Sequence, residues 1–107
     1  MTLQELLETL EEHDGSTVLR NGFGRGHSYR GRYEEIAFEP AENVTIASML
    51  AHARSCVGAT FRGYKGGFYT MYPSTRVNVA GSGEWGGDED ALTTWRLNAM
   101  LATKVKP

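Results

Sequence analysis

The residues of this chain best suited to chemistry are arginines that stand among glycines. Residues 22–27 read Gly-Phe-Gly-Arg-Gly-His, and residues 28–32 continue with Ser-Tyr-Arg-Gly-Arg. Glycine lets backbone amides approach a ligand, and a guanidinium group can bind two phosphate oxygens at once. The Gly-Lys-Ser/Thr ending of a P-loop is missing, and no clear helix follows. We expect residues 21–27 to form a loop that binds phosphate, with Arg25 and Arg30 as contacts.

A second segment mixes aromatic rings with positive charge. Residues 61–69 read Phe-Arg-Gly-Tyr-Lys-Gly-Gly-Phe-Tyr. Aromatic rings can stack on a nucleobase while lysine and arginine neutralise its phosphates. Tyr64, Lys65 and Phe68 are the predicted contacts. The alternative is that the rings belong to the core and the charged residues are their solvated neighbours.

The charge distribution favours a small anionic ligand over a nucleic-acid polymer. Residues 15–32 hold four arginines and no acid, and residues 43–83 hold three arginines, one lysine and no acid. The formal net charge is nevertheless −2 and the isoelectric point about 5.9. A polymer needs many phosphate contacts, whereas a pocket for one nucleotide needs only a few cations and a ring. We therefore expect a small anionic nucleotide as ligand, the alternative being solvated charge that merely clusters.

Metal binding and catalysis find little support in the sequence. Cys56, the one cysteine, stands four residues after His52 on a predicted helix, but its apolar neighbours favour a packed thiol. No Gly-x-Ser-x-Gly motif is present, and Glu34 and Glu35 would point to opposite faces of a strand. His27 is the one candidate base beside the basic segment. We expect no metal, no cofactor and no enzymatic activity.

Length and hydropathy predict one domain over residues 1–107 with a core of its own. No apolar run approaches the roughly 20 residues of a membrane span, and the first turns are acidic where a signal peptide would be basic. The lone cysteine excludes an intrachain disulfide. These features predict a cytoplasmic protein with no membrane partner.

Hydrophobic spacing predicts two amphipathic helices. Residues 2–13 place their leucines on one face, and Thr2 with Glu5 forms a capping box. Residues 45–57 carry a second apolar stripe, which ends before Gly58.

The remaining elements are predicted as strands, which makes the fold α+β with a mostly antiparallel sheet. Alternation or β-rich composition marks as strands residues 17–20, 29–38, 60–62, 67–72, 75–80 and 92–101. Pro73-Ser74 predicts a tight hairpin turn. A sheet of this size often leaves an edge exposed, which can drive oligomerisation.

Two longer strings carry a resemblance to a known family. Residues 27–40 read HSYRGRYEEIAFEP, and residues 61–71 read FRGYKGGFYTM. With the two predicted helices, they resemble the first-described family of bacteriophage Thoeris anti-defence proteins, over about residues 1–80. Members of that family act as sponges: they bind the cyclic ADP-ribose isomer made by a bacterial TIR-domain defence protein and hold it uncleaved. Some members also bind cyclic di- and trinucleotides of CBASS defence.

The resemblance implies an oligomer and a set of ligand contacts. The family forms dimers that build hexamers with pockets between subunits, so we expect a homo-oligomer in the cytoplasm of the infected bacterium. Arg30 would bind phosphate and Phe68 would stack on adenine. Asn78 would read a base edge or a ribose hydroxyl, and Arg96 would be a second phosphate contact. After Thr75 the sequence departs from the family pattern, which leaves the ligand open.

Two other classes of function stay open. A small enzyme that modifies or hydrolyses a nucleotide would use His27 as its base. A phage protein-interaction module would dock a partner through the sheet edge and the aromatic residues.

Overall fold

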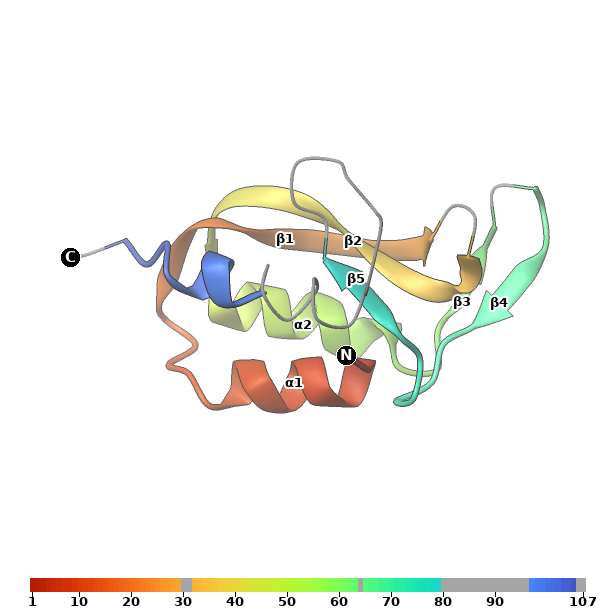
Figure 1. Ribbon diagram of the computed structural model, residues 1–107, viewed down its shortest axis with the longest axis horizontal. Coiled ribbons are helices and arrows are strands. Elements are labelled where there is room, and N and C mark those ends of the chain that lie inside the picture. The colour runs from red at the N-terminus through yellow and green to blue at the C-terminus, as the bar shows by residue number, and fades with distance from the viewer. Residues whose placement is uncertain (30–31, 64, 80–96, 106–107) are drawn as a thin grey trace.

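The computed structural model describes residues 1–29, 32–63, 65–79 and 97–105, and it confirms the α+β prediction (Figure 1). The sheet structure is mostly antiparallel, and the two predicted helices are present. Along these residues the elements are α1 (Leu3–Glu11), β1 (Val18–Tyr29), β2 (Arg32–Thr45), α2 (Ile46–Cys56), β3 (Thr60–Arg62), β4 (Phe68–Thr70) and β5 (Val77–Val79).

The larger sheet has three strands in the order β1-β2-β5. β1 and β2 form a long antiparallel hairpin, and β5 joins the other side of β2 as a parallel strand. β3 and β4 make a separate antiparallel pair. Near the C-terminus, residues 103–105 hydrogen-bond to the first residues of β1. The start of β1 therefore has partners on both sides.

Both helices begin at a threonine cap, and a glycine follows the end of α2. At α1, Thr2 Oγ1 accepts from the Glu5 N–H at 3.2 Å and Glu5 Oε1 accepts from the Thr2 N–H at 3.3 Å, which confirms the capping box. Thr45 caps α2, because its Oγ1 accepts a hydrogen bond from the Ser48 N–H at 3.1 Å. After α2, Gly58 takes a φ of +77° and donates to the Met71 carbonyl at 2.8 Å. Glycine adopts this left-handed conformation readily, so the helix ends there.

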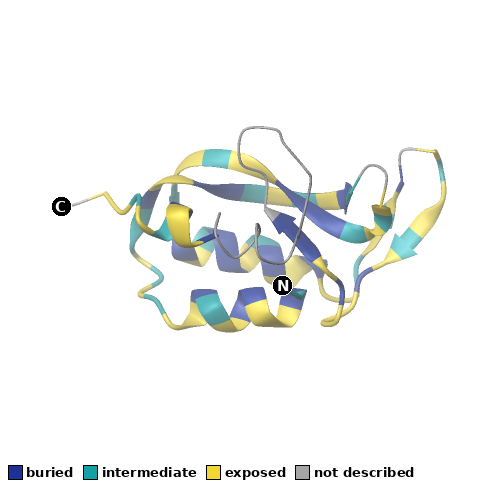
Figure 2. Ribbon diagram, in the orientation of Figure 1, coloured by how far each residue is buried: buried dark blue, intermediate teal, exposed yellow. Residues whose placement is uncertain are grey.

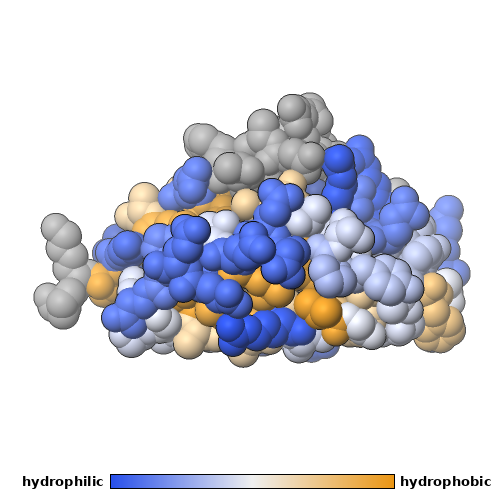
Figure 3. Space-filling view, turned by 90° about the horizontal axis from the view of Figure 1, so that it is seen from below, coloured by the Kyte–Doolittle hydropathy of each residue, from blue (hydrophilic) through white to orange (hydrophobic). Residues whose placement is uncertain are grey.

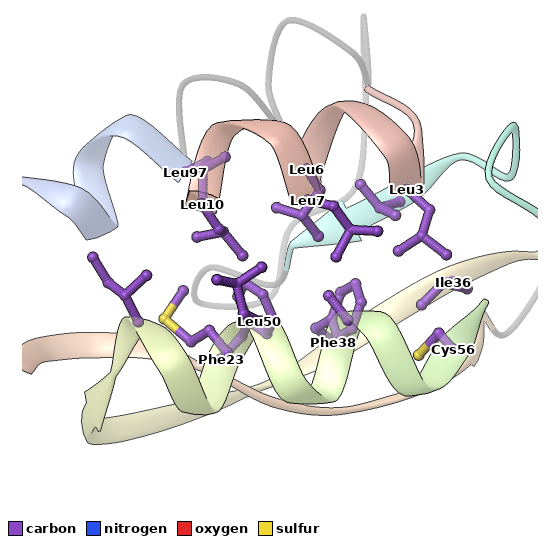
Figure 4. Close-up of a cluster of buried hydrophobic side chains, with 14 of the residues drawn as sticks. Leu3, Leu6, Leu7, Leu10, Phe23, Ile36, Phe38, Leu50, Cys56 and Leu97 are labelled. Atoms are coloured by element: carbon purple, nitrogen blue, oxygen red, sulfur yellow. The ribbon is translucent and has the colours of Figure 1, made fainter. Parts of the chain in front are cut away.

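The core lies between the helices and the larger sheet (Figures 2 and 4). α2 packs against β1 and β2, and the leucines of α1 point toward α2 and the strands (Figure 4). The rings of Phe23 and Phe38 meet with centroids 4.5 Å apart. Each fully buried large side chain stabilises the fold by about 1.5–3 kcal/mol relative to exposure. These residues are Phe23, Phe38, Leu3, Leu6, Leu10, Leu19, Ile36, Ile46, Met49, Met71 and Leu97.

The prediction that residues 21–27 form a loop is wrong, because these residues form the middle of β1, while their phosphate-binding role stays a prediction. An added Cβ at Gly22 would lie 2.5 Å from Cγ2 of Val44, and one at Gly26 would lie 2.7 Å from Sγ of Cys56. Both distances are shorter than real Cβ contacts. The strand contains glycine at these two positions because its neighbours pack too closely for a side chain, which is a requirement of the core.

β2 is also longer than predicted. It continues through Pro40 to Thr45, whereas the expected strand ended at Phe38. β5 pairs with β2 only from Ile36 to Phe38. At Pro40, one side of β2 therefore has no strand partner in the described chain, which suits a residue that lacks a backbone N–H.

The predicted last strand is wrong over residues 97–101, which are helical, while residues 92–96 lie outside the described part. Leu97 and Met100 are both buried. Residues three apart share a helix face, so burying this pair favours a helix over the alternating pattern.

The turn at Pro73-Ser74 forms, but it does not join a hairpin. The Thr75 N–H donates to the Tyr72 carbonyl at 3.0 Å, as expected for a tight turn. The strands on either side have other partners, since β4 pairs with β3 and β5 pairs with β2. The hairpin prediction is therefore wrong, because pairing across the fold overrides the local turn.

Gly26→Ala is expected to lower the free energy of unfolding by about 1–3 kcal/mol, because the new methyl group overlaps Cys56 and approaches Cε1 of Phe38 to 3.0 Å. Urea unfolding measures the change. Gly24→Ala is the matched control, since its Cβ would make an ordinary 3.6 Å contact with Ala41. The cost should be smaller in a Cys56→Ala background. A Gly26→Ala protein as stable as the parent would contradict the packing role.

Candidate functional site

The two segments singled out by their charge and aromatic content meet at one end of the molecule. The ring of Tyr33, near the start of β2, stacks on the ring of Tyr69 in β4, with centroids 5.6 Å apart and planes 27° apart. The backbone of Gly63 lies against the same Tyr33 ring, since an added Cβ would be 3.1 Å from its Cδ1. The end of the β1–β2 hairpin and the β3–β4 hairpin therefore lie side by side, at the right of Figure 1.

The β3–β4 hairpin has one packed face and one exposed face. Phe61 and Tyr69 are partners across the strands, and both are half-buried against the core. The next cross-strand pair, Arg62 and Phe68, points the other way and is exposed. Phe68 is 74% exposed, so its ring contributes little to the core. Phe61 and Tyr69 therefore pack against the core, whereas Phe68 does not.

A tight turn closes this hairpin. The Gly63 N–H donates to the Gly67 carbonyl at 2.6 Å, and the Gly66 N–H donates to the Gly63 carbonyl at 2.9 Å. Gly66 has a φ of +95°, which a residue with a side chain adopts only under strain. An added Cβ at Gly63 or Gly67 would lie 2.9 or 3.1 Å from the Tyr69 side chain. The glycines shape the turn and accommodate Tyr69, while Lys65 is exposed on the turn.

The predicted ligand contacts occupy different environments. Lys65 and Phe68 are exposed on the hairpin. Arg25 is exposed on β1, where a register shift gives β1 one residue more than β2. Three further predicted contacts lie outside the described residues: Arg30, Tyr64 and Arg96.

Asn78 is buried, with 2% of its surface exposed. Its place opposite Ala37 in the parallel pair brings Nδ2 within 3.0 Å of Oε1 of Glu35 and within 3.4 Å of the Ile36 carbonyl oxygen. The other Glu35 oxygen, Oε2, lies 4.0 Å from Nη1 of Arg32. The amide donors of Asn78 thus have acceptors within the chain, and its ligand role stays a prediction.

Arg62 is a candidate contact that the sequence analysis did not single out. It stands opposite Phe68 across the hairpin and is exposed. Its Nη2 would lie 3.7 Å from a Cβ added to Gly66, so the guanidinium group extends along the turn. A signal for it was present in the sequence, because a turn between Gly63 and Gly67 makes residues 62 and 68 cross-strand neighbours.

Cys56 and His27, the candidates for metal binding and catalysis, have different hydrogen-bond partners. Burial raises the pKa of the Cys56 thiol, which donates to the His52 carbonyl at 3.3 Å. His27 is exposed, with Nδ1 3.0 Å from the carbonyl oxygen of Ser28. Over the same residues, no three His, Cys, Asp or Glu side chains gather closely enough to hold a metal ion.

The acidic side chains of α1 face solvent on the helix side of the molecule. Figure 3 views this side and shows a largely hydrophilic surface with hydrophobic side chains between the polar ones. Glu5, Glu8 and Glu12 are exposed. Glu11 pairs with Arg54 of α2, with Oε1 3.1 Å from Nη2. The exposed arginine of α2 is therefore compensated by a carboxylate from α1.

Comparison with known proteins gives no match: no family model, no curated protein and no solved structure is significantly similar to this chain. The phage-family resemblance therefore rests on residues 27–40 and 61–71 and stays a prediction. No helix within the described ranges combines the length and the apolar character needed to cross a membrane.

Asn78→Ala is expected to lower the free energy of unfolding by about 1–3 kcal/mol, because it removes the donor to the part-buried Glu35 carboxylate and to the buried Ile36 carbonyl. Chemical unfolding tests this, with Asn98→Ala, at an exposed position, as the matched control. An Asn78→Ala protein of unchanged stability and weakened nucleotide binding would instead favour direct ligand contact.

Proposed function

We propose that this protein is a phage anti-defence sponge, which binds a cyclic nucleotide signal and withholds it from its effector without cleaving it. The implied ligands are a cyclic ADP-ribose isomer of Thoeris defence and cyclic oligonucleotides of CBASS defence. The observation that supports the proposal best is the exposed ring of Phe68, which stands opposite Arg62 on the hairpin whose turn carries Lys65. The same hairpin contacts the other motif segment through the Tyr33–Tyr69 stack.

Binding alone would produce the effect. Phe68 would stack on adenine, and guanidinium and ammonium groups would contact the phosphates, with no covalent bond made or broken. To hold a signal present at micromolar concentration, the protein must bind it with a Kd well below micromolar. That corresponds to a binding free energy of roughly −11 kcal/mol or better, and −12.3 kcal/mol corresponds to a nanomolar Kd. Enough tight sites would then keep the free signal below the level that activates its effector.

The proposal includes a homo-oligomer, from dimer to hexamer, in the cytoplasm of the infected bacterium. Its physical motivation is the exposure of Phe68, whose ring leaves one side of a bound base open to water. A second copy could cover that side, and exclusion of water strengthens charge-assisted hydrogen bonds.

Docking of a protein partner is the second candidate function. Phe68, Tyr72 and Val57 are large hydrophobic side chains that are 74%, 58% and 41% exposed. A partner protein that covered such side chains would remove apolar surface from water. Docking of a protein needs no small ligand, so a nucleotide-binding assay distinguishes it from the sponge function.

Incubating the purified protein with TIR-derived cyclic ADP-ribose isomers and a panel of cyclic di- and trinucleotides is expected to remove one of them from solution. After the protein is filtered out, the filtrate should lack that nucleotide. Heating the retained protein should release it intact, because nothing was cleaved. A new product in the filtrate would indicate an enzyme, for which His27 is the candidate base. A panel that stays wholly in the filtrate would overturn the sponge and favour the docking role.

Phe68→Ala is expected to weaken binding of the retained nucleotide by about 5- to 150-fold, since base–ring stacking contributes about 1–3 kcal/mol. The free energy of unfolding should change by less than about 0.5 kcal/mol, because the ring is exposed. Calorimetric titration and urea unfolding measure the two quantities, with Tyr72→Ala as the matched exposed-aromatic control. A Phe68→Ala protein that unfolds would show that the ring is structural. By the resemblance alone, Arg30→Ala should also weaken binding without unfolding.

A further inference from the structure

We propose that the exposed face of the β3–β4 hairpin is a binding site for a nucleoside phosphate, in which Arg62 holds the phosphate of a nucleotide whose base stacks on Phe68. This inference rests on the proposed function and deepens it, because it names a ligand class and a phosphate contact for the same site. It also predicts that a simple mononucleotide binds there.

The pairing of the strands places the two groups together. Arg62 and Phe68 are direct partners in the β3–β4 register, so they share one face of the hairpin. Side chains paired in this way have Cβ atoms about 4.5–5.5 Å apart. A base over the ring therefore brings its sugar phosphate within reach of the guanidinium group, which lies along the turn near Gly66.

Charge makes Arg62 available to an anion. No carboxylate pairs with Arg62 in the part of the chain that the structure describes, whereas Arg54 pairs with Glu11 at 3.1 Å and Arg32 approaches Glu35 to 4.0 Å. The surrounding sequence cannot supply a carboxylate locally, because residues 43–83 contain no acid. Phosphate complements this charge, and an arginine can bind it through two parallel hydrogen bonds.

The opposite face of the hairpin explains why this one stays open. Phe61 and Tyr69 attach the hairpin to the core, and Tyr69 stacks on Tyr33. Side chains alternate along a strand, so seating these two rings directs Arg62 and Phe68 outward. Further along the same face, the hydroxyls of Thr60 and Thr70 lie 2.9 Å apart. The exposed face thus combines one ring, two hydroxyls and a guanidinium group that has no carboxylate partner among the described residues.

The test compares AMP with adenosine, which differ by the phosphate that Arg62 is proposed to hold. Binding of each to the full-length protein is measured by NMR titration at low salt. The parent should bind AMP about tenfold more tightly than adenosine, and added salt should shrink the difference. Arg62→Ala should remove the preference for AMP, and Arg62→Lys should restore part of it. Phe68→Ala should weaken both ligands.

Arg54→Ala is the matched control, because it removes the same charge from an exposed arginine on α2 and should leave the AMP preference intact. A parent that binds neither compound, or an Arg62→Ala variant that keeps the preference, would overturn the inference. Neither result decides the sponge function, which depends on release of an intact cyclic nucleotide from the retained protein. A sponge that retains its nucleotide after Arg62→Ala would show that phosphate is held elsewhere.

Discussion

Where β1 runs past α2, the strand backbone at Gly26 comes so close to Cys56 that an added Cβ would lie 2.7 Å from the sulfur atom. The other buried elements depend on this approach, because α2 lies against β1 and β2 while the leucines of α1 pack toward both. Protein interiors pack as densely as crystals of small organic molecules, so even one added methyl group at such a position changes the stability of the fold. Glycine loses more entropy on folding than alanine does, and the strand accepts that cost to bring its backbone within contact of the helix.

Close approach of glycine backbone to a side chain also shapes the β3–β4 hairpin. Gly63 and Gly67 leave room for the Tyr69 ring, and Tyr69 in turn contacts Tyr33 at the end of the longer hairpin. Once Tyr69 is seated, the alternation of side chains along the strand leaves Phe68 in solvent. The packing of Tyr69 therefore also causes the exposure of Phe68. The contact of Tyr69 with Tyr33 brings together two segments that lie more than 20 residues apart in the sequence.

Electrostatics then distinguishes the arginines by their neighbours. Arg54 meets a carboxylate from α1, and Arg32 lies near Glu35, whose other oxygen accepts from the buried amide of Asn78. The exposed Arg54–Glu11 pair contributes little to stability. In both cases the neighbouring carboxylate reduces the attraction of the arginine for an anion. Arg62 has no carboxylate partner among the described residues. On the hairpin, this arginine also stands opposite the exposed ring of Phe68, and the proposed anion site rests on that combination.

The sequence by itself determined the elements whose causes are local. A leucine stripe and a capping box specify α1, and a threonine cap with Gly58 bounds α2, because helix signals act within a few residues. Tertiary packing decided the rest. Glycines that resemble a ligand loop form a strand beneath α2, and residues 97–101 turn helical to bury Leu97 and Met100. Asn78 loses its exposure by pairing with β2, and Arg62 meets Phe68 across a turn. Each of these outcomes depends on which segments approach one another across the fold, and no local pattern carries that information.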